Sequence, residues 1–235
     1  MNWLSLTWSI MLVTSGLITS AQSLQQPLEA VPMSNEGAVL LKNGELITGR
    51  ILNTTSVRGI TQVTLMTESE EKRKFRAEEM EEFMISMNKA VKLQFINERG
   101  SSIVKILSKN QPKGIPIDYI IYRNTVLKSG KEVLLQLLNP GFDDTFQVFY
   151  DPYAAKSATM EGEYLTLTGD KHKAFYVSKN DQTLLKVKKG GYQKSYKKLF
   201  GECAVMKQEE KPKWNDLGQH IWMYDQVCGP GLAKN

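Results

Sequence analysis

Histidine, the commonest catalytic base, occurs twice in the 235-residue chain, as His172 and His220. A Ser-His-Asp or Cys-His mechanism would have to use one of them, yet neither lies in a catalytic motif. His172 stands in Gly-Asp-Lys-His-Lys, which is typical of an exposed turn. His220 precedes Ile221 and Trp222 in a predicted helix, where a hydrogen-bonded structural role is expected. A Cys203–His220 dyad is conceivable, although a disulfide competes for the same cysteine.

Adjacent carboxylates offer a second kind of chemistry. Asp143 and Asp144 follow the Pro140-Gly141 turn, where neighbouring acids are normally solvated. A glycosidase needs two carboxyls from separate elements, roughly 5 to 9.5 Å apart. A hydrolase using these acids would predict a cleft and raised carboxyl pKa values, whereas an open turn would contradict it. With Asp151 they could also bind calcium, but the spacing matches no EF-hand loop.

Cysteine occurs only as Cys203 and Cys228. In an oxidising compartment an even number predicts a disulfide, which here closes a loop of about 25 residues and contributes roughly 3 kcal/mol. Two unpaired buried thiols are the alternative. Two cysteines and two distant histidines lack the ligand spacing of a zinc site, so neither a metal nor a cofactor is predicted.

The run 186–200 (KVKKGGYQKSYKKLF) combines lysine and tyrosine at helical spacing. One interpretation is a helix with a packed tyrosine face and a solvated lysine face. The other is a binding surface with a cationic rim. The candidate binding face comprises Lys188, Lys189, Tyr192, Lys194, Tyr196, Lys197 and Lys198.

Positive charge is concentrated in the same region. The net charge is +5 and the pI about 9.0, and 171–213 holds twelve lysines against four acidic residues. Such a balance often indicates nucleic acid binding, but the uncharged, apolar start of the chain predicts export, and an exported protein is less suited to that partner. An anionic lipid or glycan, or an acidic protein surface, fits better, and a face that only keeps the protein soluble is the alternative.

The start of the chain predicts export. No charged side chain lies between Met1 and Ala21, and Thr19-Ser20-Ala21 offers small residues for cleavage before Gln22. The apolar run Leu4–Ile18 is short for a hydrocarbon core about 30 Å thick. The segment before it lacks Lys and Arg, so an uncleaved anchor or a buried helix remains the alternative. No cysteine lies near the cleavage point, so a lipid-anchored lipoprotein is not expected. No later membrane span is expected either.

Most of the remaining chain predicts short antiparallel strands. Apolar runs flank Asn43-Gly44, which predicts a hairpin with a type I′ turn. A second hairpin is expected around 128–131. Further strands are predicted at 62–66, 74–76, 83–85, 91–96, 103–107, 119–122, 146–150, 164–167, 174–177 and 184–187, the last three as a meander.

Helical spacing is confined to the end of the chain. Tyr196, Leu199 and Phe200 predict one short helix, and residues 217–224 predict another behind Asn215 or Asp216 as N-cap. The fold class is therefore mainly β (α+β), with antiparallel sheets or a small barrel and a short helical C-terminal segment. The expected divisions are 1–21 signal peptide, 22–35 linker, 36–110 N-terminal β lobe, 111–190 second β lobe and 191–235 helical segment.

The order of these segments resembles uncharacterised exported proteins of Bacteroidota. The resemblance rests on GAVLLKNGELITGRI at 37–51, KFRAEEMEEF at 74–83 and AFYVSK at 174–179, together with the predicted helices near each cysteine. Met80 departs from the pattern, which usually has Ile there. The resemblance implies a periplasmic or cell-envelope setting and no known activity.

Two functional hypotheses follow. The first is an exported envelope protein that acts without catalysis, as a binding or structural module for an anionic envelope component or another envelope protein. The second is a hydrolase that cleaves envelope glycan or peptide through carboxylates such as Asp143 and Asp144. The scarcity of histidine and of catalytic motifs favours the first.

Overall fold

The computed structural model describes residues 24–28, 30–33, 35–86, 119–154, 159–161, 164–166, 173–180 and 183–229. The predicted signal peptide, the strands expected at 91–96 and 103–107, the lobe boundary at 111–117 and His172 lie outside these residues.

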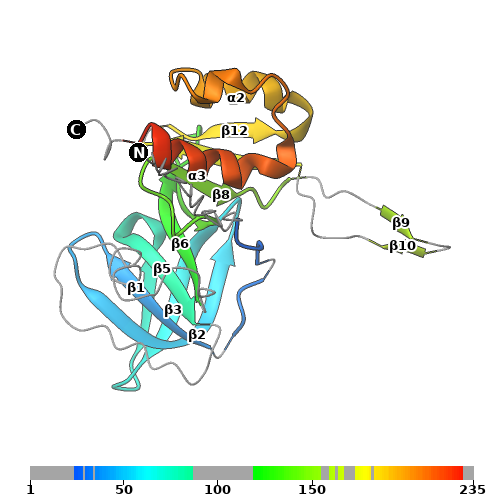
Figure 1. The fold of residues 1–235 in the computed structure, drawn as a ribbon. Coiled ribbons are helices and arrows are strands. Elements are labelled where there is room, and N and C mark those ends of the chain that lie inside the picture. Colours follow the sequence, from blue (N-terminus) through cyan, green and yellow to red (C-terminus); the bar gives the residue numbers. More distant parts are fainter. Residues whose placement is uncertain are drawn as a thin grey trace, which may run out of the picture.

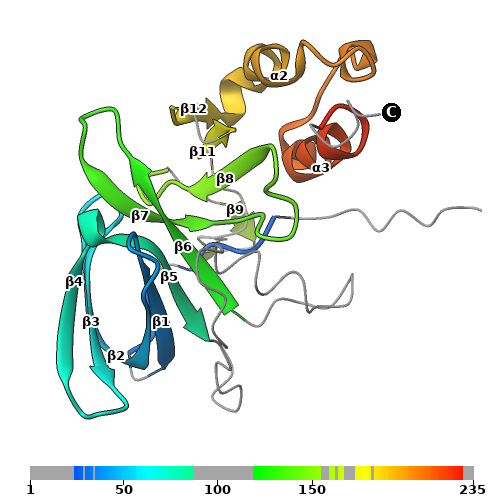
Figure 2. The same ribbon diagram turned by 90° about the vertical axis from the view of Figure 1, so that its left-hand side faces the viewer.

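A closed antiparallel barrel of six strands forms the first part of the described chain. The strand order is β7-β6-β5-β1-β2-β3, and a bridge between Ile60 and Leu134 pairs β3 with β7 and closes the cylinder. Figure 2 shows the strands curving around the barrel. The strands are β1 (Glu36–Leu41), β2 (Leu46–Ser56), β3 (Ile60–Thr67), β5 (Met80–Ser86), β6 (Tyr119–Val126) and β7 (Glu132–Leu137).

Glycine permits the approach that closes this barrel. Gly59 has a φ of +137° and directly precedes the bridging residue Ile60. A Cβ atom at Gly59 would lie 2.9 Å from Val133 Cβ and 2.9 Å from Leu135 Cδ2. Any other residue would therefore be strained at this position and would push β3 away from β7.

Both faces of the central strands are buried. Val39, Phe83 and Ile85 pack in the barrel interior, while Ala38 and Met84, which alternate with them, belong to a second buried cluster. Strands buried on both faces require nearly continuous apolar sequence rather than strict alternation. The run Phe83-Met84-Ile85 meets this requirement.

The hairpin predicted at Asn43-Gly44 is confirmed, but the type I′ turn is wrong. Only Gly44 has a positive φ, of 86°, and the Leu41 amide bonds to the Glu45 carbonyl. The loop therefore has three residues, which lets Val39 pair with Ile47 and places both in the barrel core. A two-residue loop would pair Val39 with Thr48 instead.

The same turn geometry recurs at two other hairpins. Gly130 (φ 79°) occupies the equivalent position between β6 and β7, where the predicted hairpin is confirmed. Glu70 (φ 59°) occupies it between β3 and β4 (Lys72–Arg76), which lie at the strands predicted at 62–66 and 74–76. The 3-10 turn η1 (Ala77–Glu79) follows β4, and β5 begins directly after it.

Beyond β7 the sheet continues away from the barrel and carries the helices. The strands β8 (Phe146–Tyr150), β11 (Ala174–Lys179) and β12 (Leu185–Lys188) extend it in the order β7-β8-β11-β12. Figure 1 shows α2 and α3 against this extension. The helical segments are η2 (Lys189–Gly191), α2 (Tyr192–Phe200), η3 (Met206–Gln208), η4 (Trp214–Asp216) and α3 (Leu217–Val227).

The meander expected from 164 to 187 is wrong in its first pairing. The strand β10 (Tyr164–Thr166) pairs with β9 (Thr159–Glu161) in a separate two-stranded sheet. The strand β11 pairs with β8 on one side and with β12 on the other. Its residues Ala174, Val177 and Ser178 are buried.

A second hydrophobic core joins the helices to the extended sheet. Phe146 of β8 contacts Phe200 at 5.3 Å and Tyr224 at 4.9 Å between ring centroids, both edge to face. The predicted disulfide is present, with Cys203 and Cys228 sulfurs 1.99 Å apart just beyond α2 and α3. It clamps the ends of both helices over this core.

The predicted fold class, mainly β with a short helical C-terminal segment, is confirmed, in the form of a small barrel with an extended sheet. Strands on both sides of 111–117 belong to one sheet. The helices α2 and α3, of nine and eleven residues, are too short to cross a membrane, and no other described helix meets that length.

Candidate binding surface

The tyrosine and lysine side chains of α2 lie on different faces of the helix, as their spacing in the sequence predicts. Tyr192, Tyr196 and Phe200 recur every fourth residue, so they share one face, which is buried against the second core. Tyr192 and Tyr196 are each 3% exposed, so these two members of the candidate face lie beneath the surface.

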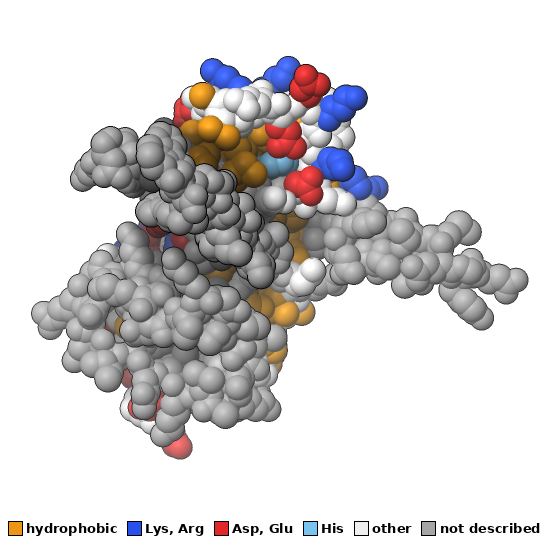
Figure 3. Space-filling view, in the orientation of Figure 1, with side chains coloured by type: hydrophobic (Ala, Val, Ile, Leu, Met, Phe, Trp, Pro, Cys, Tyr) orange, Lys and Arg blue, Asp and Glu red, His pale blue; other side chains and the backbone are white. Residues whose placement is uncertain are grey.

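The lysines lie on the opposite, solvated side of this region. The five lysines of the candidate face are exposed, and three more join them from 207–213. Within the described part of the chain none of the eight forms an ion pair. Figure 3 shows Lys side chains along the outer edge of the helical part, with Asp and Glu side chains among them. They are Lys188, Lys189, Lys194, Lys197, Lys198, Lys207, Lys211 and Lys213.

A groove of about 620 Å³ runs between α2 and the segment 206–212. Its lining includes the buried side chains Tyr196, Phe200 and Met206. Lys194, Lys197 and Lys207 also line it, as do Glu209 and Glu210. The groove therefore combines an apolar floor with a rim in which lysine outnumbers carboxylate. We call it the α2 groove.

A buried polar chain supports one wall of the α2 groove. The Tyr192 hydroxyl lies 2.7 Å from His220 Nδ1, and His220 Nε2 lies 3.0 Å from a carboxylate oxygen of Glu209. A carboxylate can only accept, so Nε2 carries the proton and Nδ1 accepts from Tyr192. Burial lowers the pKa of His220, and the neighbouring Glu209 opposes this effect. Burial also raises the pKa of Tyr192, which keeps its hydroxyl protonated.

This chain agrees with the structural role expected for His220 and leaves no Cys–His dyad, because Cys203 is oxidised. The Tyr196 hydroxyl adds a bond to the Met206 carbonyl at 2.9 Å. Together these bonds fix the segment 206–209 against α2. Sequence reasoning missed Glu209 and Lys207, because they follow the disulfide turn outside any periodic element and only the fold brings them to α2.

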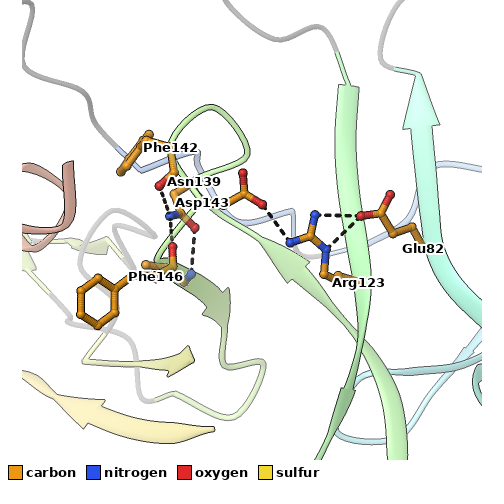
Figure 4. A network of polar contacts seen from close by, with 7 residues as sticks. Glu82, Arg123, Asn139, Phe142, Asp143 and Phe146 are labelled. Atoms are coloured by element: carbon orange, nitrogen blue, oxygen red, sulfur yellow. Dashed lines mark hydrogen bonds and ion pairs between the residues drawn. The ribbon is translucent and has the colours of Figure 1, made fainter. Parts of the chain in front are cut away.

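The predicted carboxylates belong to a different part of the molecule. Glu82 of β5 is fully buried and accepts two bonds from Arg123 of β6, at 2.9 Å from Nε and 2.8 Å from Nη2. Arg123 Nη1 also donates to Asp143 at 2.8 Å. Figure 4 shows Arg123 between the two carboxylates, with Asn139 bonded to the backbone of the same loop. This network ties the barrel to the 138–145 loop.

The acids of the proposed hydrolytic site are therefore not equivalent. Burial raises the pKa of Asp143, while Arg123 lowers it, and Asp144 is exposed on the turn. Burial raises the pKa of Asp225 in α3 to about 6, and both of its carboxyl oxygens are buried. Neither Asp143 nor Asp144 lines the α2 groove.

The third aspartate of the calcium hypothesis has its own partner. Asp151 is buried, and its carboxylate pairs with Lys186 Nζ at 2.6 Å. Among the residues with described positions, no cluster of three or more His, Cys, Asp or Glu could hold a metal ion.

The chain matches no protein-family model, no curated protein and no solved structure at a significant level. Function is therefore inferred from the chemistry of its own side chains.

Proposed function

We propose that the chain is an exported, non-catalytic binding protein of the cell envelope, and that it holds an acidic glycan along the lysine surface of α2. The observation that carries the proposal is the set of eight exposed lysines without ion pairs in the described structure, three of which (Lys194, Lys197 and Lys207) line the α2 groove. Fixed positive charge at a concave surface attracts an anionic polymer and raises its rate of association.

An acidic glycan fits this surface better than a lipid bilayer does. Membrane-surface helices insert a broad apolar face between their cations. The apolar face of α2 is instead packed into the second core. Val205 and Val227 are the exposed large hydrophobic residues of the described helical part, and neither belongs to the lysine face of α2. The carboxylates of a glycan would meet Lys194, Lys197 and Lys207 at the rim of the α2 groove.

The Cys203–Cys228 bridge supports the exported setting, because disulfides persist in oxidising compartments. The envelope location also rests on the predicted signal peptide and on the resemblance to exported proteins. Purification of the native protein followed by intact mass measurement tests this location directly. A mass that begins at Gln22 is expected, and an uncleaved chain with free thiols would contradict export.

Binding is tested with polygalacturonate, a carboxylated glycan, by isothermal titration calorimetry. The variant Lys194→Glu/Lys197→Glu reverses the charge at the groove. The variant Lys128→Glu/Lys131→Glu makes the same change of net charge at the exposed β6–β7 turn. We expect the first variant to lose at least about tenfold in affinity and the second to bind like the wild type.

Salt gives an independent measurement. With about three lysine contacts, affinity for a polyanion should fall about tenfold or more when the salt concentration rises fourfold. An equal loss of affinity in both charge-reversal variants, or an affinity that does not change with salt concentration, would contradict the proposal. Binding to anionic vesicles but not to the glycan would show that the surface meets lipid instead.

Hydrolysis has less support as a second candidate. Asp143 is bonded to Arg123, and the buried oxygens of Asp225 do not face solvent, although the pKa of Asp225 is near that of a general acid. Release of reducing ends from the same glycan, abolished by Asp225→Asn, would revive this candidate.

A further inference from the structure

The N-terminal arm, residues 24–28, 30–33 and 35, covers one end of the barrel. The Gln25 amide donates to the Leu138 carbonyl at 2.7 Å, and the Leu28 amide donates to the side chain of Gln136 at 2.7 Å. Gln136 is 1% exposed and donates in turn to the Gln26 carbonyl at 3.1 Å. The side-chain amide of Gln136 thus holds the arm in place with both of its ends.

A cavity of about 310 Å³ lies between this arm and strands β2, β3, β6 and β7. Apolar side chains make up much of its wall, among them Leu28, Val31, Ile60 and Leu134. Among the residues that the structure describes, no Asp, Glu, Lys, Arg or His lines it. A charged ligand would therefore lose its hydration without gaining an ionic partner, so the cavity is suited to a neutral molecule.

One polar group on this wall lacks a partner. Tyr122 of β6 is 6% exposed, lines the cavity, and makes no hydrogen bond in the described structure. Burial and the neighbouring Tyr150 raise its pKa, so the hydroxyl stays protonated and can donate. The hydroxyl oxygen is not among the fully buried unpaired atoms of the described residues, so it is accessible to a ligand in the cavity. The ring of Tyr122 is fixed by Phe83, 5.9 Å away between centroids, so the hydroxyl is preorganised.

We propose that this cavity is a binding site for a small neutral carbonyl compound, with its apolar body against the arm and β7 and its oxygen accepting a hydrogen bond from Tyr122. The volume falls at the lower end of small-molecule sites, which start at about 300 Å³. The site is separate from the α2 groove, so neither proposal depends on the other.

Two probes of equal size test the hydrogen bond. Acetophenone carries a carbonyl oxygen where cumene carries a methyl group. Binding to the full mature chain is followed by NMR of labelled methionine methyl groups, because Met33 lines this cavity and Met206 lines the α2 groove. We expect acetophenone to shift Met33 but not Met206, and to bind about three- to tenfold more tightly than cumene, the effect of one hydrogen bond.

The variant Tyr122→Phe removes the hydroxyl and keeps the ring. It should lose the same three- to tenfold preference for acetophenone and bind cumene as the wild type does. Equal affinity of the wild type for both probes, a shift at Met206 in place of Met33, or an absence of binding would overturn the proposal. The comparison of probes on the wild type decides the matter even where the variant fails to fold.

Discussion

Replacing Arg123 by methionine is expected to destabilise the protein by about 3–5 kcal/mol, the cost of leaving a buried carboxylate without its partner. The Glu82 side chain is 1% exposed, and Arg123 donates two hydrogen bonds to it. Methionine fills most of the volume of arginine, so a cavity adds little. The loss comes from removing the guanidinium beside the buried Glu82 and from the broken bond to the 138–145 loop.

Two further variants separate these contributions. Asp143→Asn should cost less, about 1 kcal/mol, because Asp143 is 15% exposed and Arg123 keeps its bonds to Glu82. The double variant Glu82→Leu/Arg123→Met removes the buried charge altogether. It should recover at least about 2 kcal/mol relative to Arg123→Met, since apolar replacement of a buried pair is often neutral.

Urea unfolding at neutral pH without reductant, followed by circular dichroism, measures all three variants. The order of stability should be Asp143→Asn, then the double variant, then Arg123→Met. A loss below about 1 kcal/mol for Arg123→Met would refute the reasoning, because it would mean that Glu82 needs no partner. A double variant as unstable as Arg123→Met would show that shape, not charge, governs this site.

Three other changes test the turns and the titrating groups, by the same unfolding measurement. Glu70→Gly should stabilise by about 0.5–1 kcal/mol, because Glu70 has a φ of 59°, whereas Gly44→Ala at the equivalent turn should destabilise by a similar amount. A loss of stability in Glu70→Gly would contradict this reading of the turn. Gly59→Ala should cost roughly 2–4 kcal/mol through strain and the contact with Val133, and Gly190→Ala, which meets open space, should cost little. Similar losses in both would disprove the role of Gly59 in closure. Because burial raises the pKa of Asp225 to about 6, the folded state binds its proton more tightly than the unfolded state does, and stability should fall as pH rises from about 4 to about 6. Asp225→Asn should remove this fall and gain about 1 kcal/mol at neutral pH, a value reduced for partial solvent screening; an unchanged pH profile would refute the assignment.

Local patterns in the sequence predict much of the barrel. The Asn43-Gly44 and Gly130 turns are visible because glycine tolerates positive φ, and the flanking apolar runs identify the strands. The type I′ prediction at Asn43-Gly44 failed because register is set by which residues must enter the core, here Val39 and Ile47 together. Turn sequence alone does not contain that information.

Long-range pairings account for what the sequence did not predict. The bridge between Ile60 and Leu134, the pairing of β11 with β8, and the contact of Glu209 with His220 each join residues that no periodic pattern connects. The spacing of Tyr192 and Tyr196 predicted the helix and offered a packed tyrosine face as one of two interpretations, but one helix alone could not indicate what covers that face. The unpaired hydroxyl of Tyr122 likewise appears only once the arm is folded over the barrel end.

Barrel closure has a consequence for the order of folding. Local hairpins such as β1–β2 and β6–β7 can form early, because their partners are close in sequence. The β3–β7 bridge joins residues about seventy positions apart. The chain therefore loses the conformational entropy of closing this long loop before the contacts of the bridge stabilise the fold. Until then the start of β3 at Ile60 and the middle of β7 at Leu134 are unpaired with each other, although β4 pairs with the rest of β3 and β8 pairs with the end of β7. Unpaired strand segments readily pair with other chains. Closure of the barrel at Gly59 therefore removes backbone groups through which the chain could self-associate.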